Sequence, residues 1–205
     1  MLDYIVLGMI FDEPLTGYDI KKYINAGVGN FYRVSHGNLY PTLKRLTDKK
    51  LALLDEQNYG NRVKKYYTAS DAGKKEFMDW LATPFDFSLG GSAFLAKIYF
   101  FGRLPEESCK KQLAEYEMHY RQSLQKLQEM EKSVLMEEDV TIDYFMKSTL
   151  YFGIRNTQNA IEWLSHIIEK KSLPEFIGNK SEEKWYNAKT KKTQQTRTGQ
   201  IGHCG

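Results

Sequence analysis

The stretch SHGNLYPTLKRL at residues 35–46 constrains the fold of this chain more than any other segment. Leu39, Leu43 and Leu46 recur at helical spacing and form one apolar stripe. The Ser35 hydroxyl is expected to cap this helix by accepting a backbone N–H of its first turn. The other face offers imidazole, amide, hydroxyl and cationic groups, the types that contact base edges and phosphates in a DNA groove. We therefore predict that this stretch is the recognition helix of a DNA-binding domain.

A short basic hairpin is predicted directly after the helix. Residues 51–55 form the expected first strand, residues 58–61 have turn-forming composition, and residues 63–68 form the returning strand. The cations of this hairpin are Arg62, Lys64 and Lys65, and we expect the two lysines at the hairpin tip. A helix followed by a basic hairpin is typical of a winged helix-turn-helix domain that binds DNA.

Further helices complete the first half of the chain. The pattern predicts helices over residues 2–11, 16–24 and 35–49, and a fourth helix that begins at Ser70. Thr16 with Asp19 three residues later is expected to form a capping box at the second helix. Pro41 would remove a hydrogen bond from a helix interior, so we expect the third helix to start close to Asn38.

The second half of the chain is predicted to be helical and to form dimers. A short helix over 94–101 is followed by long helices over 106–135 and 141–171, whose apolar faces are too wide for two antiparallel helices to bury alone. We therefore expect a homodimer, held by a coiled-coil-like seam that includes Leu113, Tyr116, Tyr120, Leu124, Leu127, Ile154, Ile161 and Leu164. The predicted domains are 1–82 (winged helix-turn-helix), 83–93 (linker), 94–177 (dimerisation domain) and 178–205 (a polar, largely disordered tail).

Composition excludes several classes of protein. No apolar run approaches the roughly 20 residues of a membrane-spanning helix, and the N-terminus lacks the cationic start of a secretory signal. The two cysteines form no disulfide framework, so a cytoplasmic location is expected. The four histidines show no metal-ligand spacing, and no phosphate-cradling glycine loop or nucleophile elbow is present. We expect no enzyme activity, no cofactor and no bound metal.

The candidate DNA contacts differ in role. His36 and Asn38 are placed where recognition helices reach bases, whereas Lys44 and Arg45 are expected at phosphates, as are the hairpin cations. Tyr40 is interpreted either as a DNA contact or as half-buried helix surface, and Tyr18 either as a phosphate contact or as a packing residue. The alternative for each cation is an ordinary solvated charge.

These motifs, in this order, resemble the PadR family of bacterial transcriptional regulators. The similarity lies in Leu7-Gly8, then in residues 15–20 (LTGYDI), residues 35–43 (SHGNLYPTL), residues 62–67 (RVKKYY) and residues 70–73 (SDAG). The helix that closes with Glu162-Trp163-Leu164 resembles the end of the family's C-terminal dimerisation domain. Ala69 and Ser70 depart from the family's usual larger aliphatic residue and Thr. The resemblance implies the two-domain branch, whose members commonly repress genes, some of them in response to phenolic acids.

The expected fold is mainly α with a small β-hairpin wing: an N-terminal winged helix-turn-helix plus a C-terminal antiparallel long-helix dimerisation domain. The expected function is a homodimeric repressor of double-stranded DNA with a palindromic operator, relieved by a small aromatic effector. The aromatic residues of the second half line either an effector pocket or the core and dimer interface. The alternative function is a winged-helix protein-interaction module in a larger assembly, in which Lys64→Glu with Lys65→Glu would leave partner binding largely intact.

Overall fold

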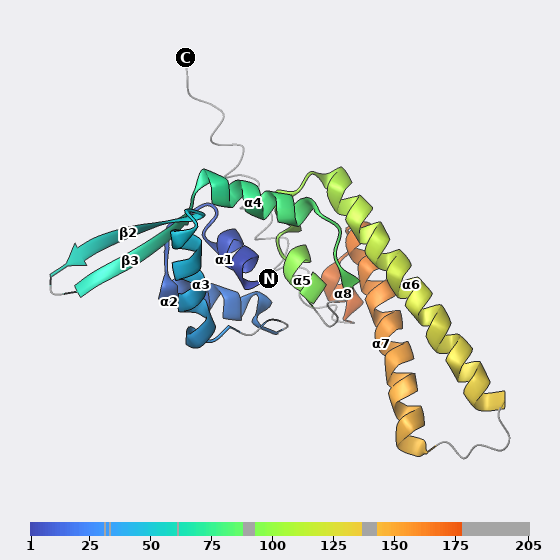
Figure 1. Ribbon diagram of the computed structural model, residues 1–205. Helices are drawn as coiled ribbons and strands as arrows, with labels where there is room; N and C mark the ends of the chain where they lie inside the picture. The colour runs from blue at the N-terminus through green and yellow to red at the C-terminus, as the bar shows by residue number, and fades with distance from the viewer. Residues whose placement is uncertain (31, 33, 61, 88–92, 137–142, 178–205) are drawn as a thin grey trace. The chain divides into compact units, whose positions relative to one another are not determined.

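The computed structural model describes residues 1–30, 32, 34–60, 62–87, 93–136 and 143–177 (Figure 1). The chain divides into two compact units, Met1–Gln112 and Leu113–Gly205. The predicted disordered tail, residues 178–205, lies outside the described residues. Within the described residues, each helix is too short or too polar to cross a membrane.

Three helices and a 3₁₀ turn form the start of the first unit. They are α1 (Leu2–Met9), α2 (Gly17–Ala26), η1 (Val28–Asn30) and α3 (His36–Asp48). Their apolar stripes meet in one core, as the 3.6-residue spacing predicts. Its fully buried aliphatic side chains are Ile5, Val6, Leu7, Ile10, Ile20, Ile24, Val28, Leu39, Leu43 and Leu46. The predicted helix-turn-helix is therefore confirmed.

Two helix starts have the side-chain caps that the sequence predicts. The Thr16 hydroxyl accepts the Asp19 backbone N–H at 3.2 Å and donates to the Asp19 carboxylate at 2.6 Å. The Ser70 hydroxyl accepts the Gly73 backbone N–H at 3.1 Å and donates to the Lys50 carbonyl at 2.7 Å. Each cap satisfies a backbone donor that lacks a partner within the helix.

Helix α3 begins earlier than the proline predicts. Ser35 is the N-cap and His36 is the first helical residue, which confirms the predicted range of 35–49 with Ser35 at its start, whereas the start near Asn38 expected from Pro41 is wrong. Pro41 then lies in the second turn, inside the helix. Since proline has no N–H, the carbonyl of Gly37 loses its usual donor four residues later.

The wing is a longer hairpin than predicted, in a three-stranded antiparallel sheet. Strands β2 (Ala52–Tyr59) and β3 (Arg62–Ala69) pair along their whole length, from Ala52↔Ala69 to Tyr59↔Arg62. This register leaves two residues in the turn, of which Gly60 has a φ of +59°, a conformation that glycine adopts without strain. Strand β1 (Leu15–Thr16), which the sequence did not predict, pairs with β3 and gives the order β1-β3-β2.

The first unit extends beyond the wing to the start of the long helices. It contains α4 (Asp71–Ala82), α5 (Ala93–Ile98) and η3 (Phe101–Arg103). The Phe100 ring meets the Phe77 ring edge-on at 5.3 Å, and the Gln112 side-chain amide donates to the Leu81 carbonyl at 3.0 Å. Through these contacts residues 94–112 pack within the first unit. The predicted domain boundary at 83–93 stays a prediction.

A buried lysine joins α5 to the end of α4. Lys97 is 1% exposed, and its ammonium contacts the Thr83 carbonyl. The same Nζ lies 3.3 Å from the Thr83 hydroxyl and 5.4 Å from the centre of the Trp80 ring. Burial lowers the pKa of Lys97 to about 8, because a charged ammonium is unfavourable away from water.

The second unit is built on an antiparallel pair of long helices, α6 (Glu106–Met136) and α7 (Tyr144–Ile168), followed by α8 (Leu173–Phe176) (Figure 1). The Ser165 hydroxyl oxygen on α7 lies 3.4 Å from a carboxylate oxygen of Glu117 on α6, and Gly153 on α7 lies opposite the Leu127 methyl groups on α6. The predicted start of the second helix at Thr141 lies outside the described residues. Helix α7 begins at Tyr144, because the Asp143 carboxylate accepts the Phe145 backbone N–H at 2.8 Å.

Candidate nucleic-acid interface

Helix α3 has one buried face and one exposed face. Leu39, Thr42, Leu43 and Leu46 are buried. On the opposite side, residues at spacings of three and four form an exposed stripe, which consists of Gly37, Pro41, Lys44 and Asp48. A helix held by one face presents the other to a ligand, so this stripe is available to a nucleic acid.

Tyr40 lies on the flank of α3 that faces α2. Its ring stacks with the His36 ring at 5.9 Å between centres and 11° between planes. A Cβ built on Gly17 would come within 3.0 Å of the Tyr40 ring, so the ring lies directly against the start of α2. The side chain is still 48% exposed. Tyr40 is therefore half-buried helix surface, which packs on one side and faces solvent on the other, and its contact with DNA stays a prediction.

A groove of about 540 Å³ lies between the start of α2, Tyr40 and strand β3. It brings four of the predicted DNA-contact residues together, namely Tyr18, Tyr40, Lys64 and Lys65. It also contains residues that the sequence analysis did not name as DNA contacts, namely Thr16, Gly17, Asp19, Val63, Tyr66 and Tyr67. The combination of phenol rings and ammonium groups suits a sugar–phosphate backbone, which offers anionic oxygens and apolar sugar edges.

The remaining predicted contacts on α3 lie outside the lining of this groove. Ser35 is the N-cap, and its backbone N–H donates to the Asn38 side-chain oxygen at 2.9 Å. The Asn38 side-chain oxygen is therefore used within the helix cap, whereas its amide nitrogen carries the N–H groups that could donate to a base. Lys44 is exposed on the outer stripe, as the prediction of a phosphate contact requires. The Arg62 side chain lies outside the described atoms, although its backbone pairs with Tyr59.

Two of the predicted phosphate-binding cations are paired with carboxylates in the free protein. The Arg45 guanidinium binds both oxygens of Asp3 on α1, with Nε 3.1 Å from one of them. The Lys65 ammonium lies 2.9 Å from the Glu56 carboxylate, which the hairpin register places directly opposite. Each carboxylate raises the pKa of its cation through the hydrogen bond and its negative charge.

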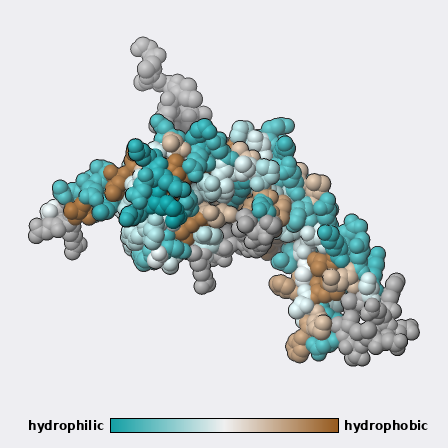
Figure 2. All heavy atoms as spheres, viewed as in Figure 1, coloured by the Kyte–Doolittle hydropathy of each residue, from teal (hydrophilic) through white to brown (hydrophobic). Residues whose placement is uncertain are grey.

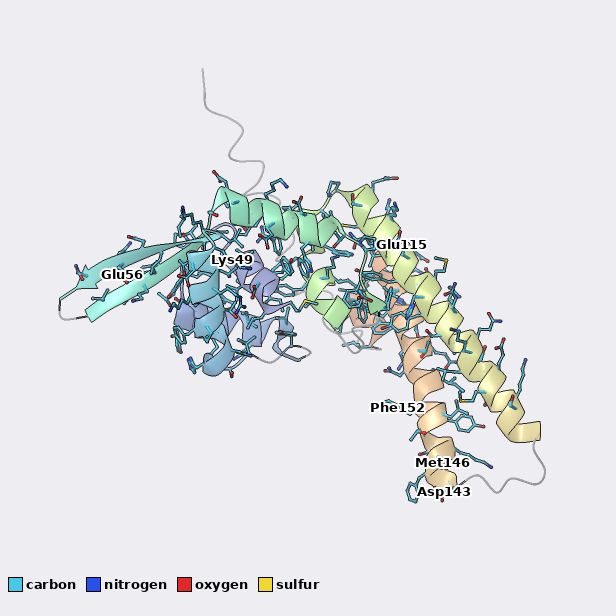
Figure 3. The ribbon with its side chains drawn as sticks, viewed as in Figure 1. Lys49, Glu56, Glu115, Asp143, Met146 and Phe152 are labelled. Atoms are coloured by element: carbon cyan, nitrogen blue, oxygen red, sulfur yellow. The ribbon has the colours of Figure 1, made fainter. Side chains whose placement is uncertain are left out.

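The lysines do not lie at the hairpin tip, which corrects the prediction. Because the turn contains two residues, the strands continue to Tyr59 and Arg62, and the lysines lie further along β3. Lys64 is opposite Gln57, and Lys65 is opposite Glu56; Figure 3 labels Glu56 on the hairpin. Tyr67 follows on the same face as Lys65, and burial raises the pKa of its hydroxyl, while the positive charge of Lys65 opposes that shift. Because successive residues of a strand point to opposite faces, Lys64 lies on the other face of β3 from Lys65 and Tyr67, and all three residues border the groove.

The predicted dimerisation residues divide into buried and partly exposed sets. Leu113, Tyr116, Ile154 and Leu164 are buried within a single chain, which leaves them little surface for a partner. Tyr120, Leu124, Leu127 and Ile161 are partly exposed. Among the exposed large apolar side chains of the long helices, Met118 and Met130 lie on α6, and five more lie close together near the start of α7. We call this set the α7 aromatic patch: Tyr144, Phe145, Met146, Tyr151 and Phe152, exposed by 47–77%. Figure 3 labels Met146 and Phe152 of this set, and Figure 2 shows hydrophobic residues at the surface where Figure 1 places the start of α7.

Comparisons with known proteins address both halves of the chain. Residues 6–79 match the transcriptional regulator PadR-like family, and residues 92–171 match the family described as virulence activator alpha C-term. The negative transcriptional regulator PadR of Bacillus subtilis is 29% identical over 175 residues, which cover 82% of this chain and 96% of that protein. A probable transcriptional regulator of Mycobacterium tuberculosis is 25% identical over 84 residues, 40% of this chain and 44% of the relative.

Solved structures give a similar result. The crystal structure of B. subtilis PadR in complex with operator DNA is 28% identical, covers 82% of this chain and 98% of its own, and has a TM-score of 0.41. The structure of the same protein in complex with p-coumaric acid is also 28% identical, covers 82% and 97%, and has a TM-score of 0.38.

Proposed function

Because this chain belongs to the transcriptional regulator PadR-like family, we propose that it is a homodimeric repressor that binds a palindromic operator in the cytoplasm. The family and the B. subtilis relative are transcriptional regulators and not enzymes, which agrees with the expectation from the sequence. The dimer, the palindromic operator and repression are inferred from the features of the two units.

The observation that carries the proposal is the groove between α2, α3 and β3. It gathers Tyr18, Tyr40, Lys64 and Lys65 beside the exposed stripe of the recognition helix. In the proposed complex α3 enters the major groove, with His36 and Asn38 nearest the bases, and the wing lysines contact phosphates. Ser35, Lys44, Arg45 and Arg62 are proposed as further contacts at the edge of this surface.

The α7 aromatic patch supports the proposal of a dimer. Five large apolar side chains exposed within a short segment are unusual for a monomer, and such patches mark interaction sites. Tyr120, Leu124, Leu127 and Ile161, which are partly exposed, would extend that surface along both helices. Two-fold symmetry would then place the two recognition helices on half-sites about one helical turn of DNA apart, or a multiple of it.

The proposal also specifies the sign of regulation and the class of effector. The word negative in the name of the B. subtilis relative supports repression. We propose that a small aromatic acid relieves it by binding better to one spacing of the two recognition helices than to the other. p-Coumaric acid, the ligand in the B. subtilis structure, is the probe. It should release DNA from this protein, whereas carboxylic acids of the same charge that lack an aromatic ring should not.

Fluorescence anisotropy against DNA upstream of the protein's own gene, with scrambled DNA as control, tests the proposal. Specific binding should weaken with salt, because each phosphate contact releases counterions. The double variant Lys64→Glu with Lys65→Glu should abolish that binding. The matched control, Lys110→Glu with Lys111→Glu, makes the same charge change at adjacent exposed lysines on α6 and should bind nearly as the unaltered protein does. Equal binding of native and scrambled DNA would contradict the proposal.

A further inference from the structure

The outer stripe of α3 carries two residues that are unfavourable in a helix. Gly37 and Pro41 lie four residues apart, one turn above the other, and both are exposed. A glycine within a helix is about 0.5–1 kcal/mol less favourable than alanine, because it loses more backbone freedom. A proline beyond the first turn removes a helical hydrogen bond. The recognition helix therefore has its weakest helix formers on the face opposite the core.

The packing of the protein does not require a glycine at position 37. Among the described residues, a Cβ built there would meet only the Ser35 Oγ, at 3.7 Å, an ordinary contact. Other glycines of the first unit behave differently: a Cβ at Gly8 would come within 2.6 Å of the Phe100 ring, and one at Gly73 within 1.9 Å of the Leu51 carbonyl oxygen. The φ of Gly37 is also outside the left-handed region that favours glycine. Neither sterics nor backbone conformation explains this residue.

We propose that Gly37 and Pro41 form a bare contact patch, where the recognition helix approaches the base edges of DNA more closely than side chains would allow. The inference rests on the proposed DNA-binding function and names the part of α3 that sets its closest approach. Glycine leaves the helix backbone uncovered. Pro41 adds a flat apolar ring and leaves the Gly37 carbonyl without its helical donor.

The neighbours of the bare patch are suited to hold the helix at that distance. Lys44 continues the same exposed stripe one turn further, where an ammonium meets a phosphate. Tyr40, on the adjoining flank, is fixed between the His36 ring and Gly17 of α2. Tyr40 on one flank has few rotamers, and Lys44 at the end of the stripe is a cation. Together they would keep α3 from tilting away from the floor of the DNA major groove.

The test is to add side-chain volume at Gly37 and measure DNA binding and folding separately. Gly37→Ala should leave the unfolding midpoint in urea unchanged or raise it, since alanine favours a helix and meets open space. Its affinity should fall at least tenfold for duplexes that the unaltered protein selects from a randomised DNA library. Gly37→Leu should lose more. The matched control is Gly153→Ala on α7, where a new Cβ would also meet only ordinary contacts, at 3.7 Å; its DNA affinity should be unchanged.

The outcomes separate this inference from the proposed function. If the unaltered protein selects sequences and Gly37→Ala and Gly37→Leu bind them equally well, the bare patch is overturned while DNA binding stands. If the unaltered protein selects no sequence from the library, the proposed function falls, and the bare patch falls with it. A stable Gly37→Ala variant with a graded loss of affinity supports both.

Discussion

The Arg45 guanidinium on the recognition helix binds both carboxylate oxygens of Asp3 on α1. The two residues are 42 positions apart, and Arg45 also donates to the Thr42 hydroxyl at 3.1 Å. Both side chains keep contact with solvent, at 45% and 30% exposure. A cation proposed to meet a phosphate is thus held by a carboxylate before DNA arrives.

Removing the Asp3 charge should strengthen DNA binding. Asp3→Asn frees the guanidinium for a phosphate and removes one negative charge near the DNA, so we expect a several-fold gain in affinity at low salt. The midpoint of urea unfolding should change little, as is usual for exposed ion pairs. The control is Asp12→Asn, which makes the same charge change but releases Arg103. Equal gains in anisotropy titrations of the two variants would mean that net charge alone is responsible.

Gly73→Ala should strongly destabilise the first unit. The new Cβ would come within 1.9 Å of the Leu51 carbonyl oxygen, which already accepts the Ser70 backbone N–H at 3.0 Å. Backbone must move to make room, so we expect a loss of about 2 kcal/mol or more in urea unfolding. Gly102→Ala, where a Cβ would meet open space, should unfold as the unaltered protein does. An unchanged midpoint for Gly73→Ala would contradict this packing of α4 against the base of the wing.

Lys97 should make stability depend on pH in the alkaline range. Its pKa is about 8 when folded and near 10.5 when unfolded. Between these values the unfolded chain binds a proton that the folded chain does not, so this group raises the free energy of unfolding as pH rises. Between pH 7 and pH 10, the free energy of unfolding of the unaltered protein should rise by on the order of 1–3 kcal/mol more than that of Lys97→Met.

The control for this pH effect is Lys75→Met. Hydrogen bonding to Asp79 raises the pKa of Lys75, so its contribution has the opposite sign and is lost as pH rises. Urea denaturation at several pH values measures both differences. Parallel pH profiles for the unaltered protein and Lys97→Met would show that the lysine is not held in a buried site.

Phe152→Glu should convert the proposed dimer to a monomer. The side chain is 73% exposed within the α7 aromatic patch, so a carboxylate there should leave each chain folded. Burying that carboxylate between two chains is unfavourable, because it would lose its contact with water. Sedimentation velocity at micromolar concentration measures the change. Met118→Glu alters an exposed apolar residue of α6 outside the patch and should remain dimeric. A monomeric unaltered protein would contradict the dimer itself.

Local relationships were predictable from the sequence. The caps at Thr16 and Ser70 join residues three positions apart, and the buried stripe of α3 follows from the spacing of three leucines. The long hairpin α6–α7 follows from the same periodicity. The caps join atoms within one turn of helix, and the apolar stripes can be recognised from the spacing of residues along a single helix, so neither requires knowledge of the tertiary fold.

Relationships across the fold were not predictable in the same way. Strand β1 is two residues long, too short to show alternation, and it forms because β3 lies beside it. The Glu56–Lys65 pair depends on a register that one residue more in the turn would change. Thr141 and Asp143 are both good helix caps by type, and only the structure distinguishes Asp143 as the one that α7 uses.

In the proposed complex, the eight-residue strands of the wing would determine how far along DNA this unit can extend. At about 3.4 Å per residue, such a hairpin spans about 24 Å, roughly twice the width of the major groove, about 12 Å. Its base is anchored twice, by the pairing of β1 with β3 and by the Ser70 cap beneath β2. A recognition helix seated on one set of base pairs would therefore leave the hairpin turn over a neighbouring stretch of duplex, and the footprint of each subunit would be set as much by the length of β2 and β3 as by α3.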